Sequence, residues 1–190
     1  MRLNGAIEPD CPLLVLAVEE EAAHLDRSMP VLLTGMGKVN AASALAAVLG
    51  RGSLPSVVVN LGTAGALRDG LRGTHEVSRA IQHDLHTAFL YLLTGQTYGA
   101  PLQVCDSGPV LATGDSFVSD KAAREQLAVH ADLVDMEGYA LAAVARKLDV
   151  PIRLVKHVSD EAGEDAARTW RESVDDCAKA LSAWARDNLR

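Results

Sequence analysis

Short, uninterrupted apolar runs constrain the fold of this chain more than any other feature. The runs occupy residues 13–18, 31–33, 57–59, 110–112 and 152–155. Continuous runs of this length are typical of strands buried on both faces, as in parallel sheets. Helix-like segments lie between them, at residues 38–49, 120–130 and 137–148. We therefore expect a three-layer α/β fold, in which helices flank both faces of a mixed, largely parallel central sheet.

The last segment has the clearest helical periodicity. Apolar and aromatic residues recur at spacings of three and four, at Trp170, Val174, Cys177, Leu181 and Trp184. Thr169 and Glu172 form a capping-box pattern, which predicts that the helix begins there. Residues 92–108 are rich in Gly, Thr and Gln and are expected to form an irregular loop or hairpin. With 190 residues and no repeat or linker, the chain is expected to be one domain, residues 1–190.

Composition excludes several classes of function. The formal net charge is −7 and no basic cluster occurs, which argues against nucleic acid or an acidic membrane as a partner. The three cysteines lie far apart without a C-x-x-C pair, which argues against a disulfide framework and a zinc site. The first ten residues lack a signal-peptide layout, and no apolar run approaches membrane-spanning length. A reducing, cytoplasmic location fits these features best.

Acidic residues occupy positions where a parallel sheet would bind its ligand. Asp135 and Glu137 open a helix, Asp160 follows the strand at 152–155, and Glu21 follows the first strand. Such positions meet at the carboxyl edge of the sheet, where α/β folds place ligands. The set predicts acid/base chemistry on a neutral or cationic substrate.

These acidic residues also admit a plainer explanation. Residues 19–21 alone are typical of an acidic first helical turn, and Asp135 and Glu137 could be explained in the same way. An acidic first helical turn explains Asp160 less well, because Asp160 follows a strand and precedes Glu161, Glu164 and Asp165. Like charges favour its protonated form, which is that of a general acid.

Three polar or glycine-containing segments are less specific. Residues 34–40 lack the Walker and dinucleotide spacings and are expected to be a tight turn. Residues 60–66 follow a strand and are either a compact turn or a ligand-binding loop. Residues 83–86, His-Asp-Leu-His, fall short of a metal-ligand set and are expected to be an ordinary loop.

Taken together and in order, these segments resemble the nucleoside phosphorylase/nucleosidase superfamily, and within it the 5′-methylthioadenosine/S-adenosylhomocysteine nucleosidases. The matching segments are residues 17–21, 35–42, 60–65, 83–84 with 87–89, 114–118, 135–137 and 159–160. No single segment would suffice, but seven in sequence are specific.

The resemblance implies a role for each matching position. Asp160 would protonate or hydrogen-bond the purine, Glu21 would hold the attacking water, and Glu137 would accept from a ribose hydroxyl. The implied substrate-binding residues are Thr63, Ala64, Gly65, Phe117, Val118, Met136, Ser159 and Trp170. Cleavage of an N-glycosidic bond needs an acid and a base on opposite sides, and it needs neither a metal nor another cofactor.

The chain departs from the family by being short. The hairpin before residue 31 and the helix expected before residue 110 are nearly absent, and Asp135 stands where Glu is commoner. These differences surround the 5′ end of the implied substrate. The leading hypothesis is hydrolysis of a 5′-modified adenosine by a homodimer. The alternatives are a phosphorylase, a futalosine-type hydrolase and a non-enzymatic nucleoside-binding protein. For the phosphorylase, Arg68 and Arg72 are the cations nearest in sequence to the segment around Thr63, and they would bind the phosphate.

Overall fold

The computed structural model describes residues 1–26 and 28–189. The helices are α1 (Lys38–Leu49), α2 (Thr87–Thr94), α3 (Lys121–Ala128), α4 (Gly138–Lys147) and α5 (Ala166–Asn188). The strands are β1 (Arg2–Asn4), β2 (Leu13–Leu16), β3 (Val31–Leu33), β4 (Val58–Ala66), β5 (Thr74–Glu76), β6 (Arg79–Gln82), β7 (Leu102–Gln103), β8 (Val110–Thr113), β9 (Leu133–Asp135) and β10 (Ile152–Asp160).

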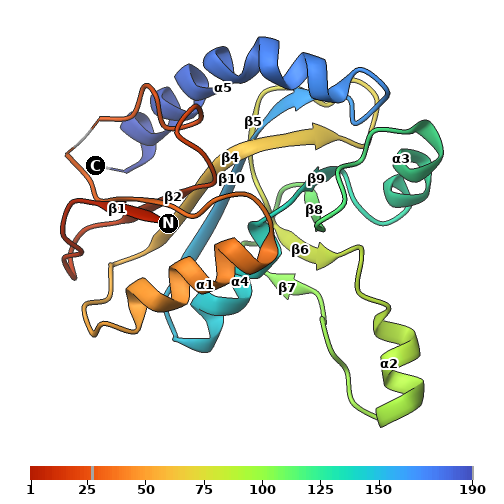
Figure 1. Cartoon of the computed structure of the whole chain (residues 1–190), viewed down its shortest axis with the longest axis horizontal. Coiled ribbons are helices and arrows are strands. Elements are labelled where there is room, and N and C mark those ends of the chain that lie inside the picture. The colour runs from red at the N-terminus through yellow and green to blue at the C-terminus, as the bar shows by residue number, and fades with distance from the viewer. Residues whose placement is uncertain (27, 190) are drawn as a thin grey trace.

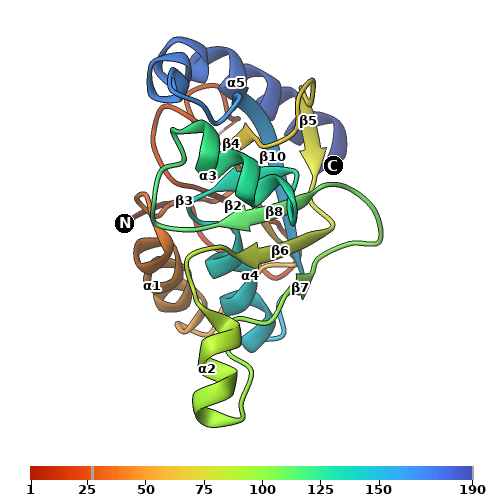
Figure 2. The same ribbon diagram turned by 90° about the vertical axis from the view of Figure 1, so that its right-hand side faces the viewer.

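Helices cover both faces of the central sheet, as Figures 1 and 2 show. Leu13 and Val15 of β2 pack in the cluster that includes residues of α1 and α4. Leu14 and Leu16 of the same strand pack in the cluster that includes residues of α5. Since successive strand residues point to opposite faces, a strand covered on both sides must be apolar at every position. The three-layer α/β prediction is confirmed.

The sheet is mixed, with β4 at its centre. Its strand order is β1-β3-β2-β4-β9-β8-β6-β7, and β10 pairs with β4 and β5. β4 runs parallel to β2 and β10 and antiparallel to β9. Because β2, β4 and β10 run in the same direction, they deliver Glu21, Thr63 and Asp160 toward one edge of the sheet.

Several elements differ from their sequence-based predictions. Residues 60–66 are not a turn: they continue β4, because β10 pairs with them along their length. α5 begins at Ala166, and the Thr169 N–H donates to the Asp165 carbonyl inside the helix, so the predicted capping box is wrong. Residues 19–21 form turns rather than a helix. α2 extends into the segment that was expected to be irregular.

Most other predicted elements are present. α1 spans the predicted residues, α3 and α4 lie within the predicted helical segments, and each apolar run contains or overlaps a strand. No helix within residues 1–26 and 28–189 is both long and apolar enough to cross a membrane.

Candidate active site

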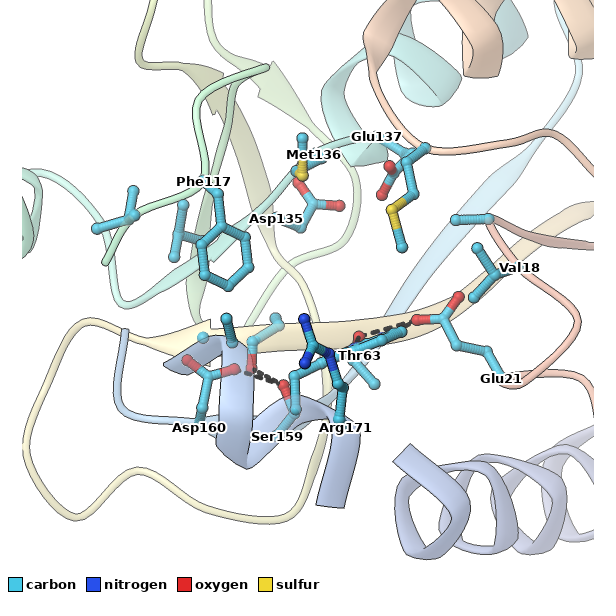
Figure 3. A pocket seen from close by; sticks show the side chains of 18 of the residues that line it. Val18, Glu21, Thr63, Phe117, Asp135, Met136, Glu137, Ser159, Asp160 and Arg171 are labelled. Carbon is cyan, nitrogen blue, oxygen red and sulfur yellow. Dashed lines mark hydrogen bonds between the residues drawn. The ribbon is translucent and has the colours of Figure 1, made fainter. Parts of the chain in front are cut away.

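A cavity of about 250 Å³ opens at the ends of β4, β9 and β10, beneath the start of α5. Its lining includes every residue that the sequence predicted for the site: Glu21, Thr63, Ala64, Gly65, Phe117, Val118, Met136, Glu137, Ser159, Asp160 and Trp170. Figure 3 shows Asp160 and Glu21 on opposite sides of the cavity, with Glu137 and Met136 across from Thr63. A ligand that enters this cavity therefore lies between carboxyl groups.

Glu21 is held by the backbone and side chain of one residue of β4. Its Oε1 accepts hydrogen bonds from the Thr63 N–H at 2.8 Å and from the Thr63 hydroxyl at 2.9 Å. The side chain is buried, and its Oε2 has no hydrogen-bond partner within the described part of the chain. One oxygen thus fixes the carboxylate, and the other remains free to bind a ligand or water.

Asp160 lies on the irregular end of β10. The pairing register with β4 shifts between Val158 and Asp160, which is the signature of a β-bulge and re-aims the side chains there. The Ser159 hydroxyl donates to Asp160 Oδ2 at 2.7 Å, and the Ala162 N–H donates to Oδ1 at 2.8 Å. Asp160 is therefore buried in a defined orientation at the cavity wall.

The acidic neighbours that the sequence places after Asp160 do not share its environment. Glu161, Glu164 and Asp165 are exposed, so water screens their charges. Glu137, by contrast, is a buried carboxyl group of the cavity wall. Burial raises the pKa of Glu137 to about 7, with help from Asp135.

Lys156 is a buried residue beside this site that the sequence analysis missed. It is only 1% exposed, and its Nζ lies 2.8 Å from Asp135 Oδ2. Burial alone would lower the pKa of Lys156, but the carboxylates of Asp135 and Glu137 outweigh burial and raise it. The available signal was Lys156 directly after the apolar pair Leu154-Val155 of a buried strand, because a lysine that is fully buried almost always has a charged partner.

Asp135 is a structural partner of Lys156, and its carboxylate oxygens are bound by protein donors. Its Oδ1 accepts from the Thr113 hydroxyl at 2.5 Å, and its Oδ2 accepts from the Gly138 N–H at 2.8 Å. With Lys156 as third donor, both oxygens are occupied. Asp135 therefore holds the lysine and the start of α4 in place.

The turn before α1 contributes a backbone donor. The Gly37 N–H donates to Glu137 Oε1 at 2.7 Å, and Gly37 has φ 94°, a conformation that favours glycine. Lys38 fixes this turn, because its Nζ lies 2.5 Å from Asp84 Oδ1. Residues 34–37 form the bent connection between β3 and α1, which is shorter than the predicted turn because residues 38–40 already belong to α1, and the Gly37 N–H orients a carboxyl group.

The His-Asp-Leu-His segment is a loop, and it supports that turn. Burial alone would raise the pKa of Asp84, but the contact with Lys38 outweighs burial. The pKa of Asp84 is therefore lowered. Burial lowers the pKa of His83, and a Cβ at Gly114 would lie 2.2 Å from its Nε2, so this close approach requires glycine. His86 stacks on Phe89 with ring centroids 5.7 Å apart.

The remaining wall is apolar, except for one guanidinium. Phe117 is 50% exposed, and Val118 is buried behind it. Val18 lines the end nearest Glu21, and Arg171 of α5 reaches toward the cavity (Figure 3). Met36 is also part of the lining. The wall suits a flat, largely apolar ligand with a few polar atoms. Arg171 was not predicted from the sequence.

A family model and a curated relative both match most of this chain. The family model described as the Phosphorylase superfamily matches residues 24–107 and 103–186. A 5′-methylthioadenosine/S-adenosylhomocysteine nucleosidase of Staphylococcus carnosus (strain TM300) is 31% identical over 193 residues, which cover 88% of this chain and 84% of that protein.

Solved structures share the fold. A 5′-methylthioadenosine/S-adenosylhomocysteine nucleosidase of Helicobacter pylori has a TM-score of 0.81 at 20% identity, with 95% of this chain and 97% of that chain covered. A futalosine hydrolase mutant of Helicobacter pylori strain 26695 has a TM-score of 0.79 at 19% identity, with 93% and 97% covered.

Proposed function

We propose that this chain, which belongs to the phosphorylase superfamily and within it to the 5′-methylthioadenosine/S-adenosylhomocysteine nucleosidase family, hydrolyses the N-glycosidic bond of a 5′-modified adenosine and releases adenine. The observation that carries this proposal is the placement of Glu21 and Asp160 on opposite sides of one cavity (Figure 3). Hydrolysis of this bond needs an acid at the leaving base and a base at the attacking water. Residues 1–190 act as one domain in this proposal, because β10 and α5 complete the cavity that β2 and β4 begin.

Asp160 is the proposed acid. As the bond between C1′ and the purine nitrogen breaks, the electron pair of that bond moves to the purine. The Asp160 carboxyl supplies a proton or a hydrogen bond to the purine. The Ser159 hydroxyl and the Ala162 N–H hold the carboxyl in that direction. Phe117 and Val118 lie on the same side of the cavity and are the proposed surface for the purine ring, with Ala64 and Gly65 beneath it.

Glu21 is the proposed base. Its partnerless Oε2 accepts a proton from a water molecule whose oxygen then bonds to C1′. The transition state carries positive charge on the sugar, which nearby carboxylates stabilise. Glu137 and Met136 lie across the cavity from Thr63 and are the proposed ribose contacts, with Glu137 as the acceptor from a hydroxyl.

The two arginines that the sequence suggested for phosphate do not support the phosphorylase alternative. Arg68 pairs with Asp132, and Arg72 contacts Glu161; neither arginine lines the cavity. An anion beside Oε2 of Glu21 would be repelled by a like charge. Mere nucleoside binding would not require Glu21 in addition to Glu137 and Asp160. These observations favour hydrolysis over both alternatives.

The functional unit in this proposal is a homodimer. α2 contributes no buried residue to the chain, and its Phe89, Tyr91, Leu92 and Leu93 side chains are all exposed. Figure 1 shows α2 projecting from the body of the molecule, so a second copy is the proposed cover for this apolar surface. Because α2 follows the loop that supports the Gly37 turn, the partner is expected to complete the 5′ end of the cavity.

The free thiols of Cys11, Cys105 and Cys177 fit a reducing cytosol, which is the proposed location. No nucleic acid, membrane or cofactor is part of the proposal.

A substrate panel tests the proposed activity. The purified protein is incubated with methylthioadenosine, adenosylhomocysteine, inosine and futalosine, with and without phosphate, and base release is measured. We expect release of adenine at the same rate in both buffers. Activity that requires phosphate and yields ribose 1-phosphate would replace hydrolysis with phosphorolysis, and preferred cleavage of futalosine would identify the bulkier substrate.

Light scattering tests the dimer. We expect a dimer, and we expect Phe89→Ala to weaken the binding of 5′-substituted nucleosides more than the binding of adenine. A monomer that is fully active at high dilution would show that one chain holds the whole site.

A further inference from the structure

A chain of hydrogen bonds joins α5 to the catalytic carboxylate. The Trp170 indole Nε1–H donates to Thr63 Oγ1 at 2.9 Å, and Thr63 Oγ1 lies 2.9 Å from Glu21 Oε1. The Thr63 N–H reaches the same carboxylate oxygen at 2.8 Å. Trp170 lies in the first turns of α5, so a helix that covers the cavity is connected directly to the proposed base.

The direction of this chain is fixed by chemistry. An indole N–H is a donor only, whereas a hydroxyl has one proton and two acceptor lone pairs. Because Trp170 cannot accept, the Thr63 oxygen must accept from it, and the hydroxyl proton is directed to Glu21. Without the indole donor, the hydroxyl is free to rotate toward other acceptors. Trp170 thus selects the rotamer in which Thr63 donates to Glu21.

These hydrogen bonds determine which carboxylate oxygen of Glu21 lacks a hydrogen-bond partner. Both donors of Thr63 occupy Oε1, and Oε2 remains buried without a partner in the described residues. Two donors on one oxygen fix the rotation of the carboxylate, and this rotation directs Oε2 at the position proposed for the water.

A second contact ties the same part of α5 to the site. The Ser173 hydroxyl donates to the Ser159 carbonyl at 3.2 Å, at the bulge that orients Asp160. The first turns of α5 therefore touch both the acid side and the base side of the cavity.

We propose that Trp170 is a positioning residue, whose indole N–H aligns the Thr63 hydroxyl and thereby holds Glu21 in its water-binding orientation. The packing of α5 over the cavity and the orientation of Glu21 are then coupled. This role is separate from any stacking of the indole ring on a purine, and it rests on the proposed hydrolase activity.

A double-mutant cycle tests the proposal. Trp170→Phe keeps an aromatic ring but removes the donor, Thr63→Val removes the hydroxyl but keeps the backbone donor, and the double variant removes both. A neutral hydrogen bond of ordinary strength predicts that Trp170→Phe lowers kcat about two- to tenfold, while KM changes less than about twofold. In the Thr63→Val background the same replacement should cause no further loss. Thr63→Ser should retain most of the activity.

Three outcomes would overturn the proposal: an unchanged kcat in Trp170→Phe, an equal loss in both backgrounds, or a change confined to KM. The last would mean that the ring acts only by stacking. If the unmodified protein releases no purine from any nucleoside, the proposed hydrolase activity is refuted instead. Failure of the Trp170 proposal is therefore distinguishable from failure of the proposed function.

Fluorescence gives a measurement that does not depend on activity. The chain contains two tryptophans, so in a Trp184→Phe background only Trp170 emits. Thr63→Val should change that emission because the indole loses its acceptor, and Thr63→Ser should not. If neither replacement changes the emission, the hydrogen bond between Trp170 and Thr63 is absent in solution, and the proposal fails even if Trp170→Phe does not fold.

Discussion

Replacing Glu137 with Gln is expected to stabilise the protein at neutral and alkaline pH. Burial raises the pKa of Glu137 from its ordinary value of 4.5 to about 7. The unfolded chain therefore loses this proton at lower pH than the folded protein does. Between these two values the folded state binds more protons, so the free energy of unfolding falls as the pH rises through this window.

The size of the effect follows from the two pKa values. The full difference corresponds to about 3 kcal/mol above pH 7, and roughly 2.5 kcal/mol of it develops between pH 5 and pH 8. Gln has nearly the same shape, can still accept from the Gly37 N–H and does not titrate. The stability of Glu137→Gln relative to the unmodified protein should therefore rise by about 2.5 kcal/mol from pH 5 to pH 8. For a chain of this size, that corresponds to a relative gain of roughly 5–10 °C in Tm.

Urea unfolding at pH 5, 6, 7 and 8 and constant ionic strength measures this difference. Glu20→Gln is the matched control, because Glu20 is an exposed glutamate next to Glu21 in the chain, and its replacement should change the stability little. If the stability difference of Glu137→Gln is the same at pH 5 and pH 8 within about 0.5 kcal/mol, burial does not raise the pKa of this carboxyl as reasoned here. Base release should fall most at pH 8, where Glu137 is charged, because the amide cannot accept a ribose hydroxyl as a charged group does.

Three further replacements test other parts of the site. Lys156→Met leaves Asp135 without its buried cation and should lower the free energy of unfolding by about 3–5 kcal/mol in urea titrations at pH 7; a loss below about 1 kcal/mol would contradict the buried pair. Asp160→Asn should lower kcat for base release by roughly 10²- to 10⁴-fold with little change in KM, and near-normal turnover would remove Asp160 from the acid role. Arg171→Ala should raise KM about two- to fivefold for a nucleoside with a carboxylate in its 5′ group but not for methylthioadenosine, and equal effects on both would exclude recognition of that carboxylate. The matched controls on exposed side chains are Lys147→Met, Glu164→Gln and Arg168→Ala.

Much of the site was accessible from sequence because strand order along the chain constrains where strand ends lie. Glu21, Glu137 and Asp160 each follow or adjoin a strand, and the ends of such strands meet at one edge of an α/β sheet. The resemblance to a known family then supplied Phe117 and Trp170, which no periodicity marks as ligand-binding. All five line the same cavity.

Other features depended on distant segments. Residues 60–66 are rich in Gly, Ala and Thr, which locally favour a turn, but pairing with β10 keeps them extended. α2 projects as a helix without burying any side chain in its own chain, so core packing gives no signal for it.

The sequence by itself determined the layers of the fold and the carboxylates of the site, because continuous apolar runs must be covered on both faces and acidic residues at strand ends must face a common edge. Only the tertiary structure decided what those carboxylates do. Lys156 is buried because Asp135 and Glu137 converge on it from another strand and helix, and the pKa of Glu137 is raised because the fold buries this carboxyl group beside Asp135. The link from Trp170 through Thr63 to Glu21 joins residues far apart in the chain, and hydrogen bonds and desolvation depend on distances that local sequence does not encode.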